Sequence, residues 1–257
     1  MPTPKGPAAP GGLHALLRRL LRAGKATSAV ADEWEWYARD YREGRVPRHA
    51  YLGEDWNDPA RIGVDLPAER VVPHVLVTAV FPFLGDAHRL LEIGCGAGRF
   101  TLPLAERYPA ILAADTSPTM LRLLRERLPA GRGVEPMLLD GRGLGSVSDA
   151  SVDATFSYDV FVHLDPHDIY RYLCELRRVL KRGGRAVLHH GNALSELGWA
   201  KFERDHAAFV AGEPGKGRFT LMSPDLFRTL AVRAGLTVHD TLLEVVRRDA
   251  IARLSSE

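Results

Sequence analysis

A turn built on Gly94, Gly96 and Gly98 follows an apolar run that contains Glu92, and a helical pattern begins directly after it. This order predicts a buried strand, a tight turn and the N-terminus of a helix. Glycine removes the Cβ atom where a ligand must lie against the backbone. A helix start offers unpaired N–H groups to an anionic or polar ligand. The turn therefore predicts a ligand-binding site.

Three acidic residues, Glu92, Asp115 and Asp140, each come at or near the end of one of the first three expected strands. In an open α/β sheet, ligands bind beyond the carboxyl ends of the strands. A single aspartate after a strand is commonly a cap or turn residue. One acid at each of three successive strand ends instead predicts a shared pocket with the glycine turn.

Other ligand chemistries fit this turn poorly. The dinucleotide pattern G-x-G-x-x-G, counted from Gly94 and Gly96, reaches Arg99, whose bulk would crowd the helix against the strand. No Gly-Lys-Ser/Thr follows the glycines, and no G-x-S-x-G occurs, so a P-loop and a serine hydrolase are both excluded. Cys95 is expected to be a small residue of the turn and not a nucleophile.

The elements that must position these residues alternate from residue 89 onward. The expected strands are 89–93, 111–114, 134–139, 152–157, 185–189, 236–244 and 250–254, and the expected helices are 67–80, 98–108, 117–128, 166–180, 194–210 and 223–234. This alternation predicts a doubly wound α/β fold whose seven-stranded sheet is mostly parallel and ends in an antiparallel edge hairpin.

Three regions follow from this pattern. Residues 1–12, rich in Pro, Gly and Ala, are expected to be a disordered arm. Residues 13–66 are expected to form a cap of helices and loops, and no period predicts a helix over 44–67. Residues 67–257 form the α/β domain, with an insertion over 192–222 after the fifth strand.

Composition limits the partners and the compartment. The chain has 257 residues, of which 46% are hydrophobic and 26% charged, and 34 basic and 32 acidic residues give a net charge of +2. This balance does not imply a nucleic-acid partner. Two isolated cysteines favour a reducing compartment, and no apolar run is long enough to span a membrane. We therefore expect a cytoplasmic protein that binds no membrane.

Five segments together resemble the class I S-adenosylmethionine-dependent methyltransferases, which have a Rossmann-like fold. They are LEIGCGAGRF, ILAADTSPTML, MLLDG, ASVDATFSYDVFVHL and LKRGGRAVLHH, in the order and spacing of that family. The similarity covers residues 67–257, and the segment 152–192 is similar to methyltransferases that tailor glycans and antibiotics. The resemblance implies S-adenosylmethionine as the cofactor and methyl transfer as the reaction.

The resemblance also implies roles for the residues of the cofactor site. Glu92 and the turn from Gly94 to Gly98, Cys95 and Gly96 included, would hold the methionine end. Asp115 would accept both ribose hydroxyls, and the backbone at Tyr158 would turn toward the methionine amino group.

The adenine end of the cofactor would involve four further residues. Thr116 and Met120 would flank the adenine ring. Asp140 would accept from the adenine amino group, and the Gly141 N–H would donate to a ring nitrogen.

Histidine is the usual base near neutral pH, and a hydroxyl acceptor needs a base. His163 follows the fourth expected strand, and the fifth ends in His189 and His190, which must point to opposite faces. We expect His163 to be catalytic, with His190 as the second candidate; each could instead be a structural histidine. A metal-assisted variant through Asp159, Asp165 and Asn192 is an alternative, but we expect no metal because the oxygen-rich ligand shell is incomplete.

The acceptor would be covered by two aromatic segments outside the shared core. The candidate substrate residues are Tyr37, Tyr41 and Trp56 in the N-terminal region and Trp199 in the insertion. They predict an enclosed pocket for a small polar acceptor, a sugar or a natural-product intermediate, methylated on O or N. The N-terminal aromatics could instead dock their helix on the core, and the insertion could instead join two copies in a homodimer. Methylation of RNA or protein, or a non-catalytic partner role, are the alternative functions.

Overall fold

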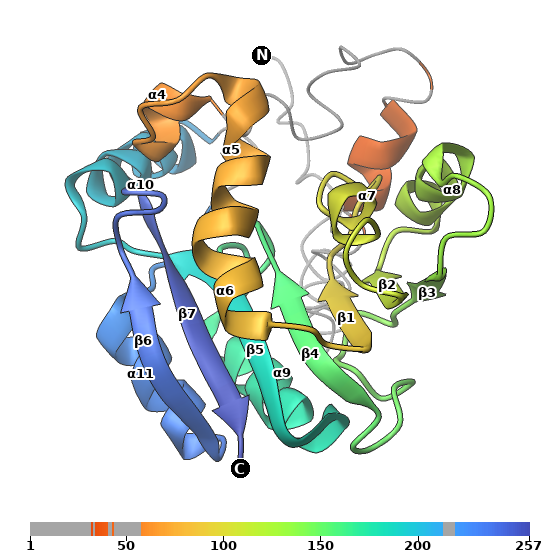
Figure 1. The fold of residues 1–257 in the computed structure, drawn as a ribbon. Helices are drawn as coiled ribbons and strands as arrows, with labels where there is room; N and C mark the ends of the chain where they lie inside the picture. The colour runs from red at the N-terminus through yellow and green to blue at the C-terminus, as the bar shows by residue number, and fades with distance from the viewer. Residues whose placement is uncertain (1–31, 33, 41–42, 44–57, 213–218) are drawn as a thin grey trace, which may run out of the picture.

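Seven strands form one sheet in this computed structural model, which describes residues 32, 34–40, 43, 58–212 and 219–257. The strands are β1 (Arg89–Ile93), β2 (Ala110–Asp115), β3 (Val134–Leu138), β4 (Val152–Ser157), β5 (Leu180–Gly191), β6 (Leu236–Leu242) and β7 (Asp249–Ser256). Their order is β3-β2-β1-β4-β5-β7-β6 (Figure 1). The strands from β3 to β5 are parallel, and β7 lies antiparallel between β5 and β6. The predicted mostly parallel sheet with an antiparallel edge pair is confirmed.

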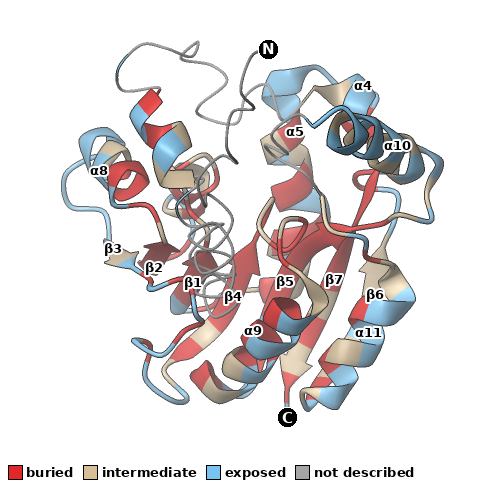
Figure 2. Ribbon diagram, turned by 180° about the vertical axis from the view of Figure 1, so that it is seen from behind, coloured by how far each residue is buried: buried red, intermediate tan, exposed pale blue. Residues whose placement is uncertain are grey.

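Helices cover both faces of the sheet (Figures 1 and 2). One face carries α5 (Ala68–Val75), the π-helical turn η2 (Leu76–Val80), α6 (Phe81–Leu84), α7 (Thr101–Leu104) and α8 (Pro118–Arg127), and the other carries α9 (Pro166–Val179) and α11 (Pro224–Arg233). Two more helices, α4 (Pro59–Ile62) and α10 (Glu196–Val210), lie beyond the carboxyl ends of the parallel strands, as does the helix over residues 34–40 (Figure 1). These helices therefore cover the end of the sheet at which the parallel strands have their carboxyl ends.

Alternate residues of each strand supply two apolar cores. In β1, Leu90 packs into the core beneath α5 to α8, whereas Leu91 points to the core beneath α9 and α11. In β2, Ile111 and Leu112 divide in the same way. Because both faces are covered, the central strands direct apolar side chains to both sides of the sheet.

The predicted helix over 98–108 is wrong in its extent, because only Thr101–Leu104 is α-helical. Gly98 has a φ of 95°, which no α-helix contains. Pro103 lacks the N–H that a continuing helix would use. The result is a long connection between β1 and β2 that contains one short helix.

Strand β5 begins five residues earlier than predicted. The segment 181–184 was expected to close a helix, but it belongs to the strand, since Val152 of β4 pairs with Leu180 before a register shift. The Lys181 ammonium also lies 2.6 Å from Oδ1 of Asp153 on β4. Strand β5 therefore includes the glycines that suggested a loop, and this ion pair lies beside them.

A short helix, α4, also lies where the sequence showed no period. Its N-terminus is capped by Asp58, whose Oδ1 accepts from the backbone N–H of Ala60 at 3.1 Å. Its C-terminus is Gly63, which has a φ of 70°. A four-residue helix is too short for a period to reveal, but the Asp-Pro start and the Gly end are cap signals.

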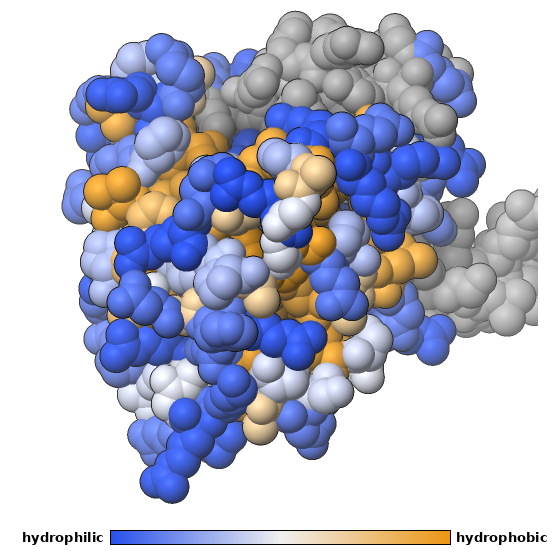
Figure 3. Space-filling view, turned by 45° about the vertical axis from the view of Figure 1, so that its right-hand side comes forward, coloured by the Kyte–Doolittle hydropathy of each residue, from blue (hydrophilic) through white to orange (hydrophobic). Residues whose placement is uncertain are grey.

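Hydrophilic side chains cover most of the face presented in Figure 3, and apolar side chains gather in the recesses between them. In the part of the chain that the structure describes, no helix combines the length and the apolar character that crossing a membrane requires.

Candidate active site

The glycine turn lies beyond the end of β1, where the strand order reverses between β2 and β4. Gly94 and Gly98 have φ values of 73° and 95°. A Cβ atom at Gly94 would lie 2.1 Å from Cγ2 of Val160, and one at Gly98 would lie 2.7 Å from Cδ1 of Leu124. Both glycines are therefore required by the close packing of the turn against its neighbours.

Gly96 differs from the other two glycines. Its φ is 52°, and a Cβ atom built on it would have no atom of the described residues within 4 Å. The bare backbone at Gly96 thus faces open space instead of packed side chains. This is the arrangement that a ligand lying against the backbone requires.

Asp115, at the end of β2, faces the same turn. Its Oδ2 accepts from the Gly96 N–H and its Oδ1 from the Ser117 N–H, both at 2.8 Å. Burial raises the pKa of Asp115, and these backbone hydrogen bonds act in the opposite direction. A carboxylate has about four lone-pair sites, so each oxygen keeps the capacity to accept one further hydrogen bond from a hydroxyl.

Glu92 is a buried carboxyl group next to the turn. It is 3% exposed, and its Oε2 has no hydrogen-bond partner among the described residues. Burial raises the pKa of Glu92 to about 8. A cationic ligand group beside this oxygen would favour the ionised form. An orphaned carboxyl oxygen beside a bare turn fits a ligand with an amino group, as the methionine end of S-adenosylmethionine has.

The residues predicted for the adenine end lie along the ends of β2 and β3. Asp140 is exposed, and its Oδ1 accepts from the Arg142 N–H at 2.8 Å. Gly141 is buried with a φ of 75°. Thr116 is half-buried, and Met120 is buried in a small cluster with Ala97 and Ala38.

Cys95 is buried within the turn, and its Sγ lies 3.7 Å from the Gly96 carbonyl oxygen. Burial raises the pKa of the thiol well above its ordinary value, so the nucleophilic thiolate is disfavoured. A role as a small turn residue fits this environment.

A helix over residues 34–40 lies against α8. The Glu35 carboxylate accepts from the hydroxyls of Ser117 and Thr119 at 2.7 and 2.8 Å, and from the Thr119 N–H at 3.1 Å. These hydrogen bonds outweigh burial and lower the pKa of Glu35. Glu35 thus holds the N-terminal helix beside the cofactor-binding loops, a contact that no local sequence pattern reveals.

Arg99 reaches across the turn to the loop after β4. Its guanidinium donates to Oδ2 of Asp159 at 2.7 Å and lies 5.3 Å from the centroid of the Tyr158 ring. This ion pair outweighs burial and lowers the pKa of Asp159. Asp159 has a φ of 58°, a left-handed conformation that is uncommon for aspartate. Arg99, the residue that does not fit the dinucleotide pattern, therefore positions the carboxylate of Asp159.

Tyr158 and His189 form a buried stack with ring centroids 4.1 Å apart. The Asp159 N–H donates to Nδ1 of His189 at 3.1 Å, which assigns the proton of a neutral ring to Nε2. That Nε2 lies 3.2 Å from Oδ2 of Asp249, although the contact is not aligned as a hydrogen bond. Arg248 completes the group, 2.6 Å from the same oxygen.

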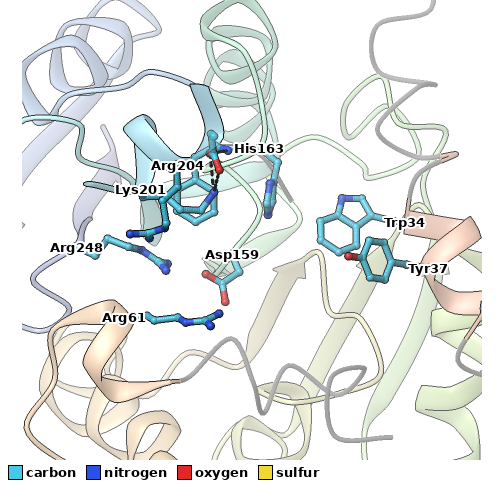
Figure 4. Close-up of a pocket in the computed structure, with 10 residues that line it drawn as sticks. Trp34, Tyr37, Arg61, Asp159, His163, Lys201, Arg204 and Arg248 are labelled. Carbon is cyan, nitrogen blue, oxygen red and sulfur yellow. Dashed lines mark hydrogen bonds and ion pairs between the residues drawn. The ribbon is translucent and has the colours of Figure 1, made fainter. Parts of the chain in front are cut away.

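A cavity of about 540 Å³ lies beside this group (Figure 4). It is lined by Trp34, Tyr37, Arg61, Asp159, His163, Lys201, Arg204, Asp205, Phe219 and Arg248. His163 stands edge-on to two rings, with its centroid 5.1 Å from Trp34 and 5.3 Å from Phe219. The structure thus brings two predicted residues, His163 and Tyr37, together in one cavity.

His190 lies on the opposite face of the sheet. It is fully buried and stacks on Phe227 of α11 with centroids 3.9 Å apart. Burial lowers the pKa of His190 to about 4. The two histidines at the end of β5 do alternate as predicted, and His190 is not among the residues that line the cavity.

Trp199, another predicted substrate residue, is not among the residues that line the cavity. Trp199 on α10 is 49% exposed, stacks on Phe202 and donates its indole N–H to Glu203 at 3.1 Å. Tyr41 and Trp56 lie outside the described residues, as do residues 1–12 and most of the cap region.

Among the described residues, no group of three or more His, Cys, Asp or Glu side chains is arranged to hold a metal ion. Of the metal-site candidates, Asp159 pairs with Arg99, and Asp165 caps α9 by accepting from the His167 N–H at 2.8 Å. Asn192 caps the following turn through the Leu194 N–H at 3.1 Å.

Comparison with known proteins identifies the class of domain that carries this site. Residues 91–188 match a family model described as a methyltransferase domain. An uncharacterized methyltransferase of Mycobacterium tuberculosis (strain ATCC 25618 / H37Rv) is 34% identical over 138 residues, 54% of this chain and 54% of that protein. A trans-aconitate 2-methyltransferase of Rhodopseudomonas palustris (strain BisB5) is 32% identical over 130 residues, 50% of this chain and 48% of that protein. The chain spans about half the length of these curated relatives.

A solved structure with the same fold is magnesium protoporphyrin IX methyltransferase from Synechocystis PCC 6803 with bound SAH. Its TM-score is 0.56 at 18% identity, over 82% of this chain and 98% of that chain. The fold, the glycine turn and the family match define a class I S-adenosylmethionine-dependent methyltransferase domain in this chain. S-adenosylmethionine is the cofactor of that domain.

Proposed function

We propose that this protein is an enzyme that transfers the methyl group of S-adenosylmethionine to an oxygen or nitrogen of a small polar acceptor. The observation that supports this proposal best is the cavity of about 540 Å³ that is lined by His163, by Asp159, which pairs with Arg99 of the glycine turn, and by aromatic rings. Its volume lies in the range of small-molecule sites.

The cofactor would be held by residues of the turn and the next two strand ends. Glu92 and the glycine turn would bind the methionine end, together with the backbone at Tyr158. Asp115 would accept the ribose hydroxyls, a charge-assisted interaction suited to a carboxylate. Thr116, Met120, Asp140 and Gly141 would surround the adenine.

When bound, the cofactor supplies an activated methyl group on a positively charged sulfur. The protein's own task is then to orient the acceptor, exclude water and remove a proton where the acceptor is a hydroxyl. His163 would accept that proton. The edge-on contacts of its ring with Trp34 and Phe219 restrict the orientation of the imidazole, which supports a role as a positioned base.

The sequence predicts a sugar or a natural-product intermediate as the acceptor. It also predicts that the protein acts in the cytoplasm. The relative named trans-aconitate 2-methyltransferase adds a small organic acid to the acceptors worth testing. Because the match covers half of each chain, the relative's name does not by itself fix the acceptor of this protein.

A labelled methyl group distinguishes the alternative functions. The protein is incubated with S-adenosylmethionine carrying a ¹³CD₃ methyl group, together with a small-molecule library, total RNA or total protein. We expect the mass label in a low-molecular-weight product. Label in RNA or protein would reject the small-acceptor proposal in favour of a macromolecular methyltransferase.

Thermal shift tests the cofactor independently of any acceptor. We expect stabilisation by S-adenosylmethionine and by S-adenosylhomocysteine, and none by NAD, because a ligand that binds the native state raises the melting temperature. Stabilisation by NAD alone would contradict the assignment of the turn. Binding of S-adenosylmethionine without methyl transfer to any acceptor pool would favour a non-catalytic partner role.

A further inference from the structure

The cavity has two chemically different sides (Figure 4). Arg61, Lys201, Arg204 and Arg248 lie on one side, and the rings of Trp34 and Tyr37 lie on the other. Asp159 and His163 lie between them. The basic residues come from three separate elements: α4, α10 and the turn before β7. Folding therefore gathers cations that are scattered in the sequence.

Positive charge exceeds negative charge on the basic side. Four described lining residues are cationic and two, Asp159 and Asp205, are acidic. Three further charged side chains pair with this lining: Asp58 lies 3.2 Å from Arg61, Asp249 lies 2.6 Å from Arg248, and Arg99 lies 2.7 Å from Asp159. Together the five cations and four acids leave an excess of one positive charge, His163 not counted. Asp205 is engaged by Lys201 at 2.5 Å, and Asp159 by Arg99, which is not itself a lining residue. The excess positive charge therefore lies with Arg204, whose guanidinium takes part in none of these ion pairs.

Phe219 holds two of these cations in place. The Lys201 ammonium lies 4.6 Å and the Arg248 guanidinium 4.7 Å from the centroid of its ring. The Phe219 N–H also donates to Oδ2 of Asp205 at 3.0 Å. Cations fixed in this way lose little entropy when they bind an anion, so the site is preorganised.

The cations also repel one another. Burial lowers the pKa of Lys201, and the charges of Arg248 and Arg204 lower it further, against the pull of Asp205. An anion in the cavity would relieve this repulsion. The geometry of the basic side and its excess charge both favour an anionic ligand.

We propose that the acceptor carries an anionic oxygen group, a carboxylate or a phosphate, that binds to the basic side while a flat apolar body lies against Trp34 and Tyr37. This inference rests on the proposed function, since it names the acceptor class of the same cavity. The anionic group anchors the acceptor, and the group to be methylated lies toward His163.

The test uses three matched probes and saturating S-adenosylhomocysteine. Phenyl phosphate, 3-phenylpropionate and the neutral 3-phenylpropionamide are titrated into the wild-type protein by calorimetry. We expect at least one anion to bind about tenfold more tightly than the amide, since hydrogen bonds to charged groups are the stronger ones. The tighter of the two anions identifies the anionic group. Equal affinities, or no anion binding at millimolar concentration, would overturn the proposal.

Variants then locate the bound anion. Arg204→Gln and Arg61→Gln, at exposed sites on α10 and α4, should each weaken anion binding several-fold, and the double variant about tenfold. The matched control is Arg228→Gln, at an exposed site on α11 outside the cavity. The proposal would be overturned if the double variant bound the anion as tightly as the wild-type protein does. It would also be overturned if the double variant lost no more affinity for the anion than Arg228→Gln.

Cofactor titrations separate this inference from the proposed function. We expect S-adenosylmethionine to bind the double variant as it binds the wild-type protein. If the double variant loses cofactor affinity, the cations serve the cofactor's carboxylate and the anionic acceptor is rejected. If the wild-type protein itself does not bind S-adenosylmethionine, the proposed function fails, whatever the anions do.

Discussion

Oε2 of Glu35 accepts a hydrogen bond from the hydroxyl of Ser117 at 2.7 Å, although the two residues are 82 positions apart in the chain. Ser117 is the N-cap of α8 and directly follows the loop that begins at Asp115. The same carboxylate accepts from the backbone of Thr119, in the first turn of α8, where a negative charge is favoured by the helix dipole. Glu35 therefore acts as a second cap on α8, supplied by a distant helix.

Replacing Glu35 by alanine should destabilise the protein by about 1–2 kcal/mol, because a buried capping interaction is lost. Urea unfolding measures the change in the free energy of unfolding. Asp32→Ala, at an exposed position N-terminal to residues 34–40, is the control and should have little effect. A Glu35→Ala variant as stable as the wild-type protein would mean that the contact contributes nothing to docking of the helix.

Asp115→Ala should weaken binding of S-adenosylmethionine by about 2–3 kcal/mol, since two charge-assisted hydrogen bonds to the ribose are removed. Calorimetry measures the affinity. Asp225→Ala, at an exposed position in the first turn of α11, provides the control. Unchanged cofactor affinity in Asp115→Ala would refute the assignment to the ribose.

Gly96→Ala should mainly lower cofactor affinity, whereas Gly94→Ala should mainly lower stability. Gly96→Ala meets no described atom, so it should cost only about 1 kcal/mol of stability for its left-handed backbone while lowering cofactor affinity at least tenfold. Gly94→Ala would place a Cβ atom 2.1 Å from Val160 and should unfold or strongly destabilise the protein. Thermal melting and calorimetry separate the two effects. Normal cofactor binding by Gly96→Ala would show that no ligand approaches that backbone.

Glu92 should make stability depend on pH. Its pKa is about 8 in the native protein and 4.5 in a model peptide, so between these values the native state binds more protons than the unfolded state. The contribution of Glu92 to the free energy of unfolding therefore falls as the pH rises from about 4.5 to about 8. Glu92→Gln should remove this loss, so that the variant melts several degrees above the wild-type protein at pH 8 and close to it at pH 5.

The same substitution should weaken cofactor binding, because glutamine cannot provide a negative charge to the amino group. Melting curves at the two pH values and calorimetry at pH 8 provide both measurements. A parallel pH dependence of melting in the variant and the wild-type protein would contradict a buried, neutral Glu92.

His163→Ala should reduce turnover about 10²- to 10⁴-fold on a hydroxyl acceptor while leaving cofactor affinity intact, as expected for loss of a general base. Turnover is measured with the acceptor identified by the labelled-methyl screen. His167→Ala, at an exposed site in the first turn of α9, is the matched control. Wild-type turnover in His163→Ala would remove this residue from the mechanism.

The sheet could be predicted closely from the sequence because its signals are local. Buried strands such as 89–93 and 152–157 are short apolar runs, and caps such as Ser117-Pro118 mark helix starts. The glycine turn and its three acids could be predicted for the same reason. Boundaries failed where tertiary contacts override propensity, as in the glycine-containing start of β5, where Leu180 pairs with Val152 of β4.

The acceptor side of the site could be predicted only in outline. The N-terminal region and the insertion were predicted to cover the acceptor, but Arg248 lies outside both, and Arg61 and Phe219 were not singled out within them. These residues meet only after folding, so no local pattern connects them. Trp199 was chosen for its aromatic character, yet its partners are Phe202 and Glu203 on its own helix. Spacing on one segment cannot tell which face of α10 meets the cavity.

The distribution of the cavity residues along the chain bears on how this domain evolves. Of the ten described residues that line the cavity, Asp159 and His163 alone fall within the segment 91–188 that matches the family model. The cofactor half of the site can therefore be inherited unchanged while the cationic and aromatic walls diverge independently. Two descendants of one ancestor can keep the same methyl donor and come to act on unrelated molecules. Sequence identity within residues 91–188 would not reveal that difference in acceptor.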